Sequence, residues 1–277
     1  MKAVFPLAIM SFLAACTPSD KSPEEAVSAK ARALPSSLEA AVNSPFRSEE
    51  NRKRDQYRHP KETLEFFGIQ PYMTVVEITP GAGWYTEILA PYLSAKGTYT
   101  AAVFPAGDSE YRQKILQKFD SWVKAQPELK VKTSVFGPPE EVNIAPAGSA
   151  DMVLTFRNVH NWMGGGNADA AFAAFYKALK PGGVLGVVEH RANEKKENNP
   201  RSGYVKESEV IRMAEKAGFK LDAKSEVNAN PKDSKDYDTG VWTLPPTLRK
   251  GDEDRAKYVS IGESDRMTLR FVKPKNS

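Results

Sequence analysis

The fold is decided by residues 74–84, which read TVVEITPGAGW. Residues 74–78 are mostly β-branched and apolar, which is typical of a buried strand, and the acid Glu77 stands near its end. The Pro-Gly-Ala-Gly sequence then turns the chain, since glycine adopts backbone conformations that other residues avoid. A helix is expected to begin near Trp84. A strand, a glycine turn and a helix form the first unit of a doubly wound sheet, where a nucleotide-like ligand binds at the carboxyl edge.

Strand-like and helix-like segments alternate along the rest of the chain. This pattern is typical of a parallel sheet covered by helices. The stretch 266–272 alternates apolar and polar residues and is expected to pair antiparallel. The sequence thus predicts an α/β fold: a Rossmann-like, doubly wound, mostly parallel sheet with an antiparallel last strand and helices on both faces. The expected strands are 73–78, 98–104, 130–136, 151–156, 183–189, 219–227 and 266–272, and the clearest helices are 60–67, 111–122, 172–179 and 207–217.

Composition and charge exclude several classes of protein. The 277 residues are 40% hydrophobic and 27% charged, which is typical of a folded globular protein and excludes collagen, coiled coil and wholesale disorder. The 39 Lys and Arg residues and the 35 Asp and Glu residues are interspersed, for a net charge of +4. Because there is no basic tail or stripe, we expect no nucleic-acid partner.

Residues 1–15 are predicted to be a signal peptide. Lys2 precedes an apolar run, 3–13, that is shorter than the roughly 20 residues of a membrane-spanning helix. The run leads into Leu-Ala-Ala-Cys, and Cys16 is the only cysteine of the chain, so no intramolecular disulfide is possible. This ending resembles a bacterial lipobox, which implies cleavage after residue 15 and a lipid on Cys16. The alternative is a plain cleaved signal with an incidental cysteine.

Residues 17–45 are predicted to be a tether, because they are rich in Ser, Pro, Ala, Lys and Glu and nearly lack large apolar residues. A short helix starting near Ser36 is compatible with the capping-box spacing of Ser36 and Glu39. Residues 46–277 are expected to form a single domain. The lipobox resemblance, with Thr17 in place of Asp, implies a periplasmic protein anchored to the outer membrane through its lipid.

The glycine turn departs from the dinucleotide-binding pattern, because Thr86 stands where the third glycine is required. With Glu77 before it, the turn resembles the first motif of class I S-adenosyl-L-methionine (SAM)-dependent methyltransferases. It is similar to that of a bacterial group of exported, predicted methyltransferases with the motif Glu-x-x-Pro-Gly-x-Gly-Trp-Tyr-Thr. The resemblance covers roughly residues 46–274. Its further matches are Arg58-His59-Pro60, residues 151–162, Leu-Lys-Pro-Gly-Gly at 179–183 and Ala-Gly-Phe at 217–219.

The resemblance implies a methyltransferase-type domain that binds SAM and methylates a small-molecule or otherwise unidentified acceptor. It also implies that Arg157 and Asn158, just beyond the fourth strand, line the transfer site. Pro80 is expected to hold Thr79 in an extended conformation, since a proline disfavours the helical region for the residue before it. The residues that we expect to hold SAM are Glu77, Thr79, Gly81, Gly83, Trp84, Asp108 and Asn158.

The second predicted strand ends in Val-Phe-Pro at 103–105, where the family usually has a carboxylate that accepts both ribose hydroxyls. Asp108, three residues later, reaches the ribose only if the loop folds back. The favoured alternative is that Asp108 shares the cap of the next helix with Ser109. The third strand exits through Phe136, which could stack on adenine, but two prolines then remove backbone donors for its edge.

The three histidines are His59, His160 and His190, and all are expected near the same cleft. His160 and His190, with Glu189 beside the latter, are the candidate catalytic residues, since histidine accepts protons near neutral pH. The alternative for each is a structural, hydrogen-bonded histidine. Because HxH and HExxH spacings are absent, no metal site is expected.

Two aromatic residues adjoin the glycine turn. Trp84 and Tyr85, together with Trp162 farther on, could stabilise a sulfonium through cation–π contacts. The alternative is that they pack the first helix on the sheet. Residues 228–265 carry aromatic residues that suggest docking, and they could form a lid over the cleft.

Two other functions remain open from the sequence. A non-catalytic periplasmic ligand-binding or sensor lipoprotein of the same fold is favoured by the missing ribose carboxylate and by the cytoplasmic origin of SAM. Fold alone does not determine function. A nicotinamide-dependent oxidoreductase is disfavoured by the missing third glycine and the missing ribose acid.

Overall fold

One seven-stranded sheet organises the computed structural model, which describes Met1 and residues 32–197 and 199–275. The strands are β1 (Thr74–Ile78), β2 (Thr98–Val103), β3 (Lys132–Val135), β4 (Ala150–Phe156), β5 (Leu179–His190), β6 (Lys220–Ser225) and β7 (Arg266–Val272). Their order in the sheet is β3-β2-β1-β4-β5-β7-β6. Strands β1 to β5 are parallel, and β7 pairs antiparallel with both β5 and β6. The predicted α/β fold is therefore confirmed.

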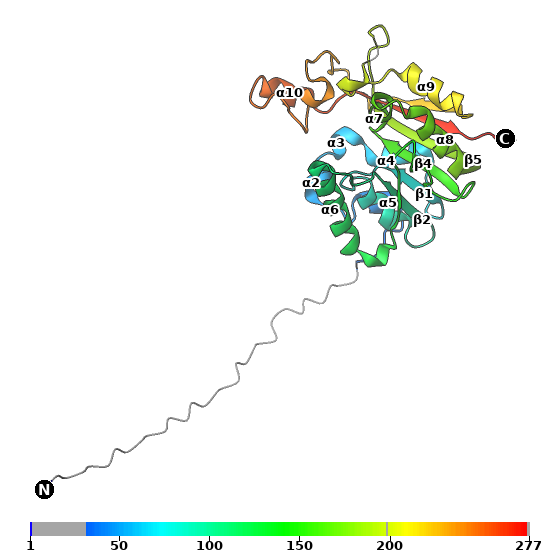
Figure 1. Cartoon of the computed structure of the whole chain (residues 1–277), viewed down its shortest axis with the longest axis vertical. Coiled ribbons are helices and arrows are strands. Elements are labelled where there is room, and N and C mark those ends of the chain that lie inside the picture. Colours follow the sequence, from blue (N-terminus) through cyan, green and yellow to red (C-terminus); the bar gives the residue numbers. More distant parts are fainter. Residues whose placement is uncertain (2–31, 198, 276–277) are drawn as a thin grey trace. The chain divides into compact units, whose positions relative to one another are not determined.

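Helices cover both faces of the sheet (Figure 1). The α-helices are α1 (Leu38–Val42), α2 (Glu49–Arg52), α3 (Asp55–Arg58), α4 (Pro60–Phe67), α5 (Thr86–Leu93), α6 (Glu110–Lys124), α7 (Val159–Gly164), α8 (Ala168–Ala178), α9 (Glu207–Lys216) and α10 (Arg255–Ile261). Three short 3₁₀ helices are η1 (Pro127–Leu129), η2 (Pro200–Ser202) and η3 (Gly240–Thr243). Helices α7, α8 and α9 cover one face, and α1, α4, α5 and α6 cover the other.

The strand sequences explain why both faces are buried. In β1, Val76 packs with the α8 and α9 side, whereas Val75 packs with the α4 and α5 side. In β4, Val153 and Leu154 divide between the two sides in the same way. Successive side chains of a strand point to opposite faces, so a continuous apolar run requires a helix layer on each side.

Helix α1 lies inside the predicted tether of residues 17–45. Ser37, one residue after the expected cap, accepts a hydrogen bond from the Ala40 amide through its side-chain oxygen at 3.1 Å. Leu38 and Ala41 are buried in the core cluster beside α5. The compact unit accordingly begins at Ala33 and not at residue 46. The short helix expected near Ser36 therefore forms, capped one residue later, and with only two buried residues its docking on the domain was not evident from composition.

Two N-terminal predictions fall outside the described residues. They are the signal peptide, of which only Met1 is described, and the lipid on Cys16. Among the residues that the structure describes, no helix combines the length and the apolar character needed to cross a membrane.

Residues 228–265 dock at the carboxyl end of β5 and the amino end of β7. Asp233 anchors them, because its carboxylate accepts hydrogen bonds from the Tyr204 hydroxyl at 2.9 Å and from the Asp265 amide at 2.8 Å. The ring of Trp242, in η3, lies edge-on to the ring of His160, with 6.2 Å between centroids. This segment therefore covers the start of α7.

Gly186 provides a test of how closely α4 packs on the sheet. A Cβ atom at this position would lie 2.7 Å from Leu154 Cδ2 and 2.9 Å from the Phe67 ring. We expect Gly186→Ala to lower the free energy of unfolding by about 1–3 kcal/mol through overpacking, measured by urea denaturation. Gly164→Ala is the matched control, because a Cβ there meets nothing within 4 Å. Equal stabilities of the two variants would contradict this packing.

Candidate functional site

The carboxyl ends of β1, β2, β3 and β4 meet at one edge of the sheet, and two cavities lie there. The wide cavity has a volume of 720 Å³, and the narrow cavity a volume of 140 Å³. Both cavities are lined by Thr79, Gly81 and Asn158. The two cavities therefore adjoin at the turn after β1. The wide cavity is otherwise bordered by residues that include Phe104, Arg112, Glu141 and Trp162, and the narrow cavity by Glu77, Pro80, Trp84, Tyr85, Phe156 and Arg157.

Left-handed residues build the turn between the two cavities. Thr79, Gly81 and Gly83 have φ angles of 50°, 62° and 92°. The extended conformation predicted for Thr79 is wrong. The Thr79 amide donates to the Ala102 carbonyl at 2.8 Å, and the Asn158 side-chain amide donates to the Ile78 carbonyl at 3.0 Å. These hydrogen bonds outweigh the steric preference of a residue before proline.

Gly81 leaves the turn open, since a Cβ there would meet nothing within 4 Å. Gly83 lines neither cavity among the described residues. A Cβ at Gly83 would instead lie 3.5 Å from the Phe119 ring, which packs α6 against the turn. The first glycine of the pair therefore borders the space for a ligand, whereas the second shapes the backbone.

Glu77 is a buried acid in the wall of the narrow cavity. Its Oε2 accepts hydrogen bonds from the Tyr99 hydroxyl at 2.6 Å and from the Thr86 hydroxyl at 3.2 Å. Burial raises the pKa of Glu77 to about 7, although these two hydrogen bonds and the charge of Arg157 act in the opposite direction. Glu77 can therefore pair with an ammonium group near neutral pH.

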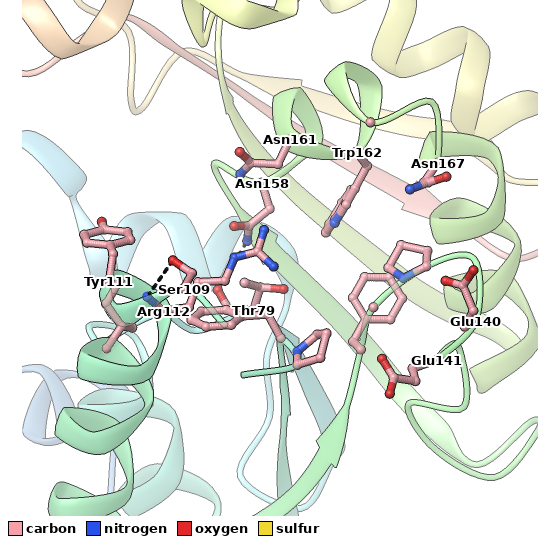
Figure 2. Close-up of a pocket in the computed structure, with 18 residues that line it drawn as sticks. Thr79, Ser109, Tyr111, Arg112, Glu140, Glu141, Asn158, Asn161, Trp162 and Asn167 are labelled. Atoms are coloured by element: carbon pink, nitrogen blue, oxygen red, sulfur yellow. Dashed lines mark hydrogen bonds between the residues drawn. The ribbon is translucent and has the colours of Figure 1, made fainter. Parts of the chain in front are cut away.

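The wide cavity contains polar residues that sequence reasoning missed. Figure 2 shows Arg112 reaching from α6 toward Asn158, with Glu140 and Glu141 at another part of the rim. A Cβ at Gly137 would lie 2.6 Å from Glu141 Oε2 and 2.8 Å from Pro105 Cγ, so this carboxylate lies beside the exits of β2 and β3. No local motif marks Glu141, and only the adjacency of β2 and β3 brings it here.

Asp108 does not line either cavity within the described part of the chain. Ser109 alone caps α6, since its side-chain oxygen accepts a hydrogen bond from the Arg112 amide at 3.4 Å (Figure 2). Phe136 lines the wide cavity but is only 1% exposed, with its ring edge-on to that of Trp162. Phe136 therefore belongs mainly to the core.

Trp84 combines the cation–π role and the packing role that the sequence suggested for it. Its ring borders the narrow cavity, and its indole nitrogen donates to the Asn51 carbonyl at 3.0 Å. The Arg58 guanidinium lies 4.6 Å from the centroid of the Trp84 ring. Tyr85 stacks on Phe156 with 3.6 Å between centroids, and both rings also border this cavity.

The structure brings the three candidate catalytic residues together. His160 Nδ1 lies 3.1 Å from Glu189 Oε1, and the His160 amide donates to Glu189 Oε2 at 3.2 Å. The His190 ring lies 5.7 Å from that of His160, and its Nδ1 contacts the hydroxyl of Ser264. Burial, followed by the charges of His160 and Arg157, holds the pKa of His190 well below its usual value. None of the three lines the wide or the narrow cavity among the described residues.

The same three residues form a possible metal-ligand cluster that the sequence spacing did not reveal. Their ligand atoms lie within 4.8 Å of one another. However, the charges of Arg157, Arg266 and Arg58 all act on His190. A neighbourhood of buried guanidinium groups disfavours a divalent cation. The geometry favours a hydrogen-bonded His160–Glu189 pair. His59 lies apart, beside a separate cavity lined by Asn228 and Arg266.

Glu263 gathers three arginines beside this region. Its oxygens lie 2.6 Å from Arg54 Nε, 3.3 Å from Arg58 Nε and 3.1 Å from Arg266 Nη2. Burial alone would raise the pKa of Glu263, but the guanidinium charges outweigh it and lower the pKa to about 2. Glu263 is therefore a firmly ionised carboxylate.

No protein-family model and no curated protein matches the sequence. Solved structures share its fold. A SAM-dependent methyltransferase from Aquifex aeolicus is 17% identical with a TM-score of 0.55, over 80% of this chain and 93% of that one. The [4+2]-cyclase SpnF is 16% identical with a TM-score of 0.54, over 78% of this chain and 80% of that one.

A third structure, of phosphoethanolamine N-methyltransferase 2 from Haemonchus contortus in complex with SAM, is 17% identical with a TM-score of 0.53. The match covers 79% of this chain and 53% of that one. At these identities the likeness establishes the fold, which is that of the class I methyltransferases. The presence of a cyclase among the similar structures illustrates that this fold carries more than one chemistry.

Glu263→Gln tests the arginine contacts. It should lower the free energy of unfolding at pH 7 by about 3 kcal/mol, because it leaves buried guanidinium groups without their carboxylate. The pKa of Glu263 is about 2 in the folded protein against an ordinary value of 4.5. Its stabilisation is thus present above the ordinary value and is lost as the pH falls toward 2.

Urea denaturation at several pH values measures this difference. The gap between wild type and Glu263→Gln should close as the pH falls from about 4.5 to about 2. The control is Glu253→Gln, whose exposed ion pair with Lys250 should contribute less than about 1 kcal/mol. A gap that does not change with pH would refute the assignment.

Proposed function

We propose that this protein is a SAM-dependent methyltransferase that binds SAM across the two adjoining cavities and methylates a small-molecule acceptor. One observation carries the proposal: the open turn at Gly81 separates the wide cavity from the narrow cavity, and the wall of the latter contains an acid that titrates near neutral pH. The amino-acid end of SAM would occupy the narrow cavity, and its adenosine the wide cavity. The fold supports this placement, because ligands bind at this edge of doubly wound sheets.

Glu77 is the proposed partner of the α-ammonium group of SAM. Its carboxylate lines the narrow cavity and already accepts two hydrogen bonds on Oε2. An ammonium group would add the charge partner that the buried acid lacks. Thr79 and Gly81 would approach the ligand through their backbone, and Asn158 would hold the turn in place.

Glu141 is the proposed acceptor of the ribose hydroxyls. It supplies a carboxylate beside Pro105, where β2 itself provides none. The earlier candidate, Asp108, is exposed and lies outside the cavity lining. Phe104 and Trp162 border the same cavity and offer apolar surface for the adenine.

When SAM is bound, it supplies a methyl group on a positively charged sulfur. A bond forms between the acceptor nucleophile and the methyl carbon while the carbon–sulfur bond breaks, and the electron pair stays on sulfur to give S-adenosylhomocysteine. Positioning provides most of the catalysis in such a displacement. If the nucleophile carries a proton, we assign its acceptance to His160, whose Nδ1 is held by Glu189, with His190 beside it. A water would relay that proton, since neither imidazole lines a cavity.

The location of the protein enters as a proposal from the sequence. A lipid on Cys16 would hold it at the periplasmic face of the outer membrane.

The second candidate function, a non-catalytic ligand-binding or sensor lipoprotein, is favoured by one observation. His160, Glu189 and His190 all lie outside the lining of both cavities.

The Glu77→Gln variant tests the ammonium site. Because a protonated Glu77 cannot pair with an ammonium, the affinity of the wild type for SAM should rise as the pH increases through about 7. The variant should bind SAM at least about tenfold more weakly at pH 8. Calorimetric titration at pH 6 and pH 8 measures both effects.

The stability of the same variant provides its control. The raised pKa of Glu77 means that its contribution to stability is lost as the pH rises through about 7, so Gln at this position should not destabilise the protein at pH 8. SAM affinity that is unchanged in a folded Glu77→Gln variant would rule out the ammonium site.

Glu141→Gln and Asp108→Asn form a matched pair for the ribose site. Glu141→Gln should weaken SAM binding about tenfold, because two ribose hydroxyls lose their charged acceptor. Asp108→Asn should leave the affinity unchanged within about twofold, since Asp108 lines no cavity in the described residues. Competition with S-adenosylhomocysteine measures both variants, and the reverse order of effects would return the ribose role to Asp108.

A further inference from the structure

Four arginines lie close together beside the narrow cavity, and Glu263 forms ion pairs with three of them. Arg54, Arg58 and Arg266 all contact Glu263. The guanidinium of Arg157 forms no ion pair and no hydrogen bond within the described ranges. Burial, and then the charge of Arg157, lowers the pKa of Arg58. Among the described residues, Glu263 is the only carboxylate that forms an ion pair with any of these four arginines.

Burial makes this excess of positive charge costly. Arg58 and Arg266 are each only 2% exposed, and Arg58 Nη1 is buried without a hydrogen-bond partner. Burial, and then the charge of Arg266, lowers the pKa of Arg157 to about 10, which still leaves it protonated at neutral pH. Buried charges are normally paired, so the guanidinium of Arg157, which lines the cavity, points to a partner that binds from outside.

The cluster borders the narrow cavity through Arg157. Arg157 lines the cavity directly, together with Trp84, Tyr85 and Phe156. Arg58 lies behind the same wall, with its guanidinium carbon 4.6 Å from the centroid of the Trp84 ring. Of the described residues, Glu77 alone contributes a carboxylate to the lining of this cavity. An entering anion would thus meet guanidinium and aromatic groups.

SAM cannot balance this charge. Its amino-acid end is a zwitterion and its sulfur is positive, so bound SAM adds one positive charge to the site. The remaining positive charge calls for a second ligand with negative charge. Arginine suits such a ligand, because its planar guanidinium binds both oxygens of a carboxylate or phosphate.

We propose that the methyl acceptor carries an oxyanion, a carboxylate or a phosphate, which Arg157 binds at the narrow cavity with Arg58 behind it. The term acceptor rests on the proposed methyltransferase function, whereas the anion site rests on the arginines themselves.

The anion site is tested without SAM, by calorimetric titration of the full-length protein with inorganic phosphate and, separately, with acetate at low ionic strength. At least one of them should bind saturably to the wild type. Arg157→Gln should weaken that binding by at least about tenfold, because the paired charge-assisted hydrogen bonds are lost. Arg157→Lys should weaken anion binding less than Arg157→Gln does, since lysine keeps the positive charge but lacks the planar pair of N–H donors of the guanidinium. The stronger of the two anions identifies the chemical class.

Arg212→Gln is the matched control, because it makes the same change in charge on the exposed face of α9. It should leave anion binding unchanged, and thermal unfolding checks that all variants are folded.

Three results would overturn the proposal. The first is that neither anion binds saturably, and the second is that binding does not depend on Arg157. The third is that Arg157→Gln loses SAM and anion binding together, which would assign the arginine to the carboxylate of SAM. A wild type that binds the anion through Arg157 but does not bind SAM would instead refute the methyltransferase function and leave the anion site standing.

Discussion

The side chain of Asn158 joins the end of β4 to the turn after β1, and the candidate site depends on this contact. Its amide donates to the Ile78 carbonyl at 3.0 Å and reaches the Thr79 carbonyl at 3.4 Å. Thr79 can therefore keep its left-handed φ of 50° ahead of Pro80. That conformation keeps Gly81 facing open space, with one cavity on each side. Without it, the turn would have no fixed shape for a ligand to match.

Charge divides the site into two parts. The narrow cavity borders Glu77, whose pKa is about 7, and Arg157. Three further arginines near Arg157 form ion pairs with Glu263. The wide cavity carries Arg112 together with Glu140 and Glu141. A ligand with an ammonium at one end and ribose hydroxyls at the other would match this distribution. The excess of positive charge beside Arg157 then leaves room for a negatively charged second ligand.

The sequence predicted the elements well, because their signals are local. The β-branched run of β1 and the apolar spacing of α6, α8 and α9 each require a particular secondary structure, and all of them form where expected. The prediction was weaker where the apolar pattern was short, or where hydrogen bonds from other strands opposed a local backbone preference. Helix α1 has two buried residues in a polar stretch, and the conformation of Thr79 is set by hydrogen bonds from other strands.

The candidate site could be predicted only in part. Glu77, Gly81 and Asn158 were found because they adjoin the glycine turn or the end of a strand. Glu141 was missed, because a loop after β3 carries it to the exit of β2. The arginine group was also missed, since its members come from α3, the end of β4 and β7, and from the residue before α3. Such clusters depend on tertiary contacts that no spacing in the sequence encodes.

A crystal structure of the protein with S-adenosylhomocysteine tests the central claim most directly. The account predicts the homocysteine end between Glu77 and Gly81 in the narrow cavity, and the adenosine in the wide cavity with its ribose beside Glu141. Crystals soaked at millimolar concentration that show the ligand elsewhere, or show none, would contradict it.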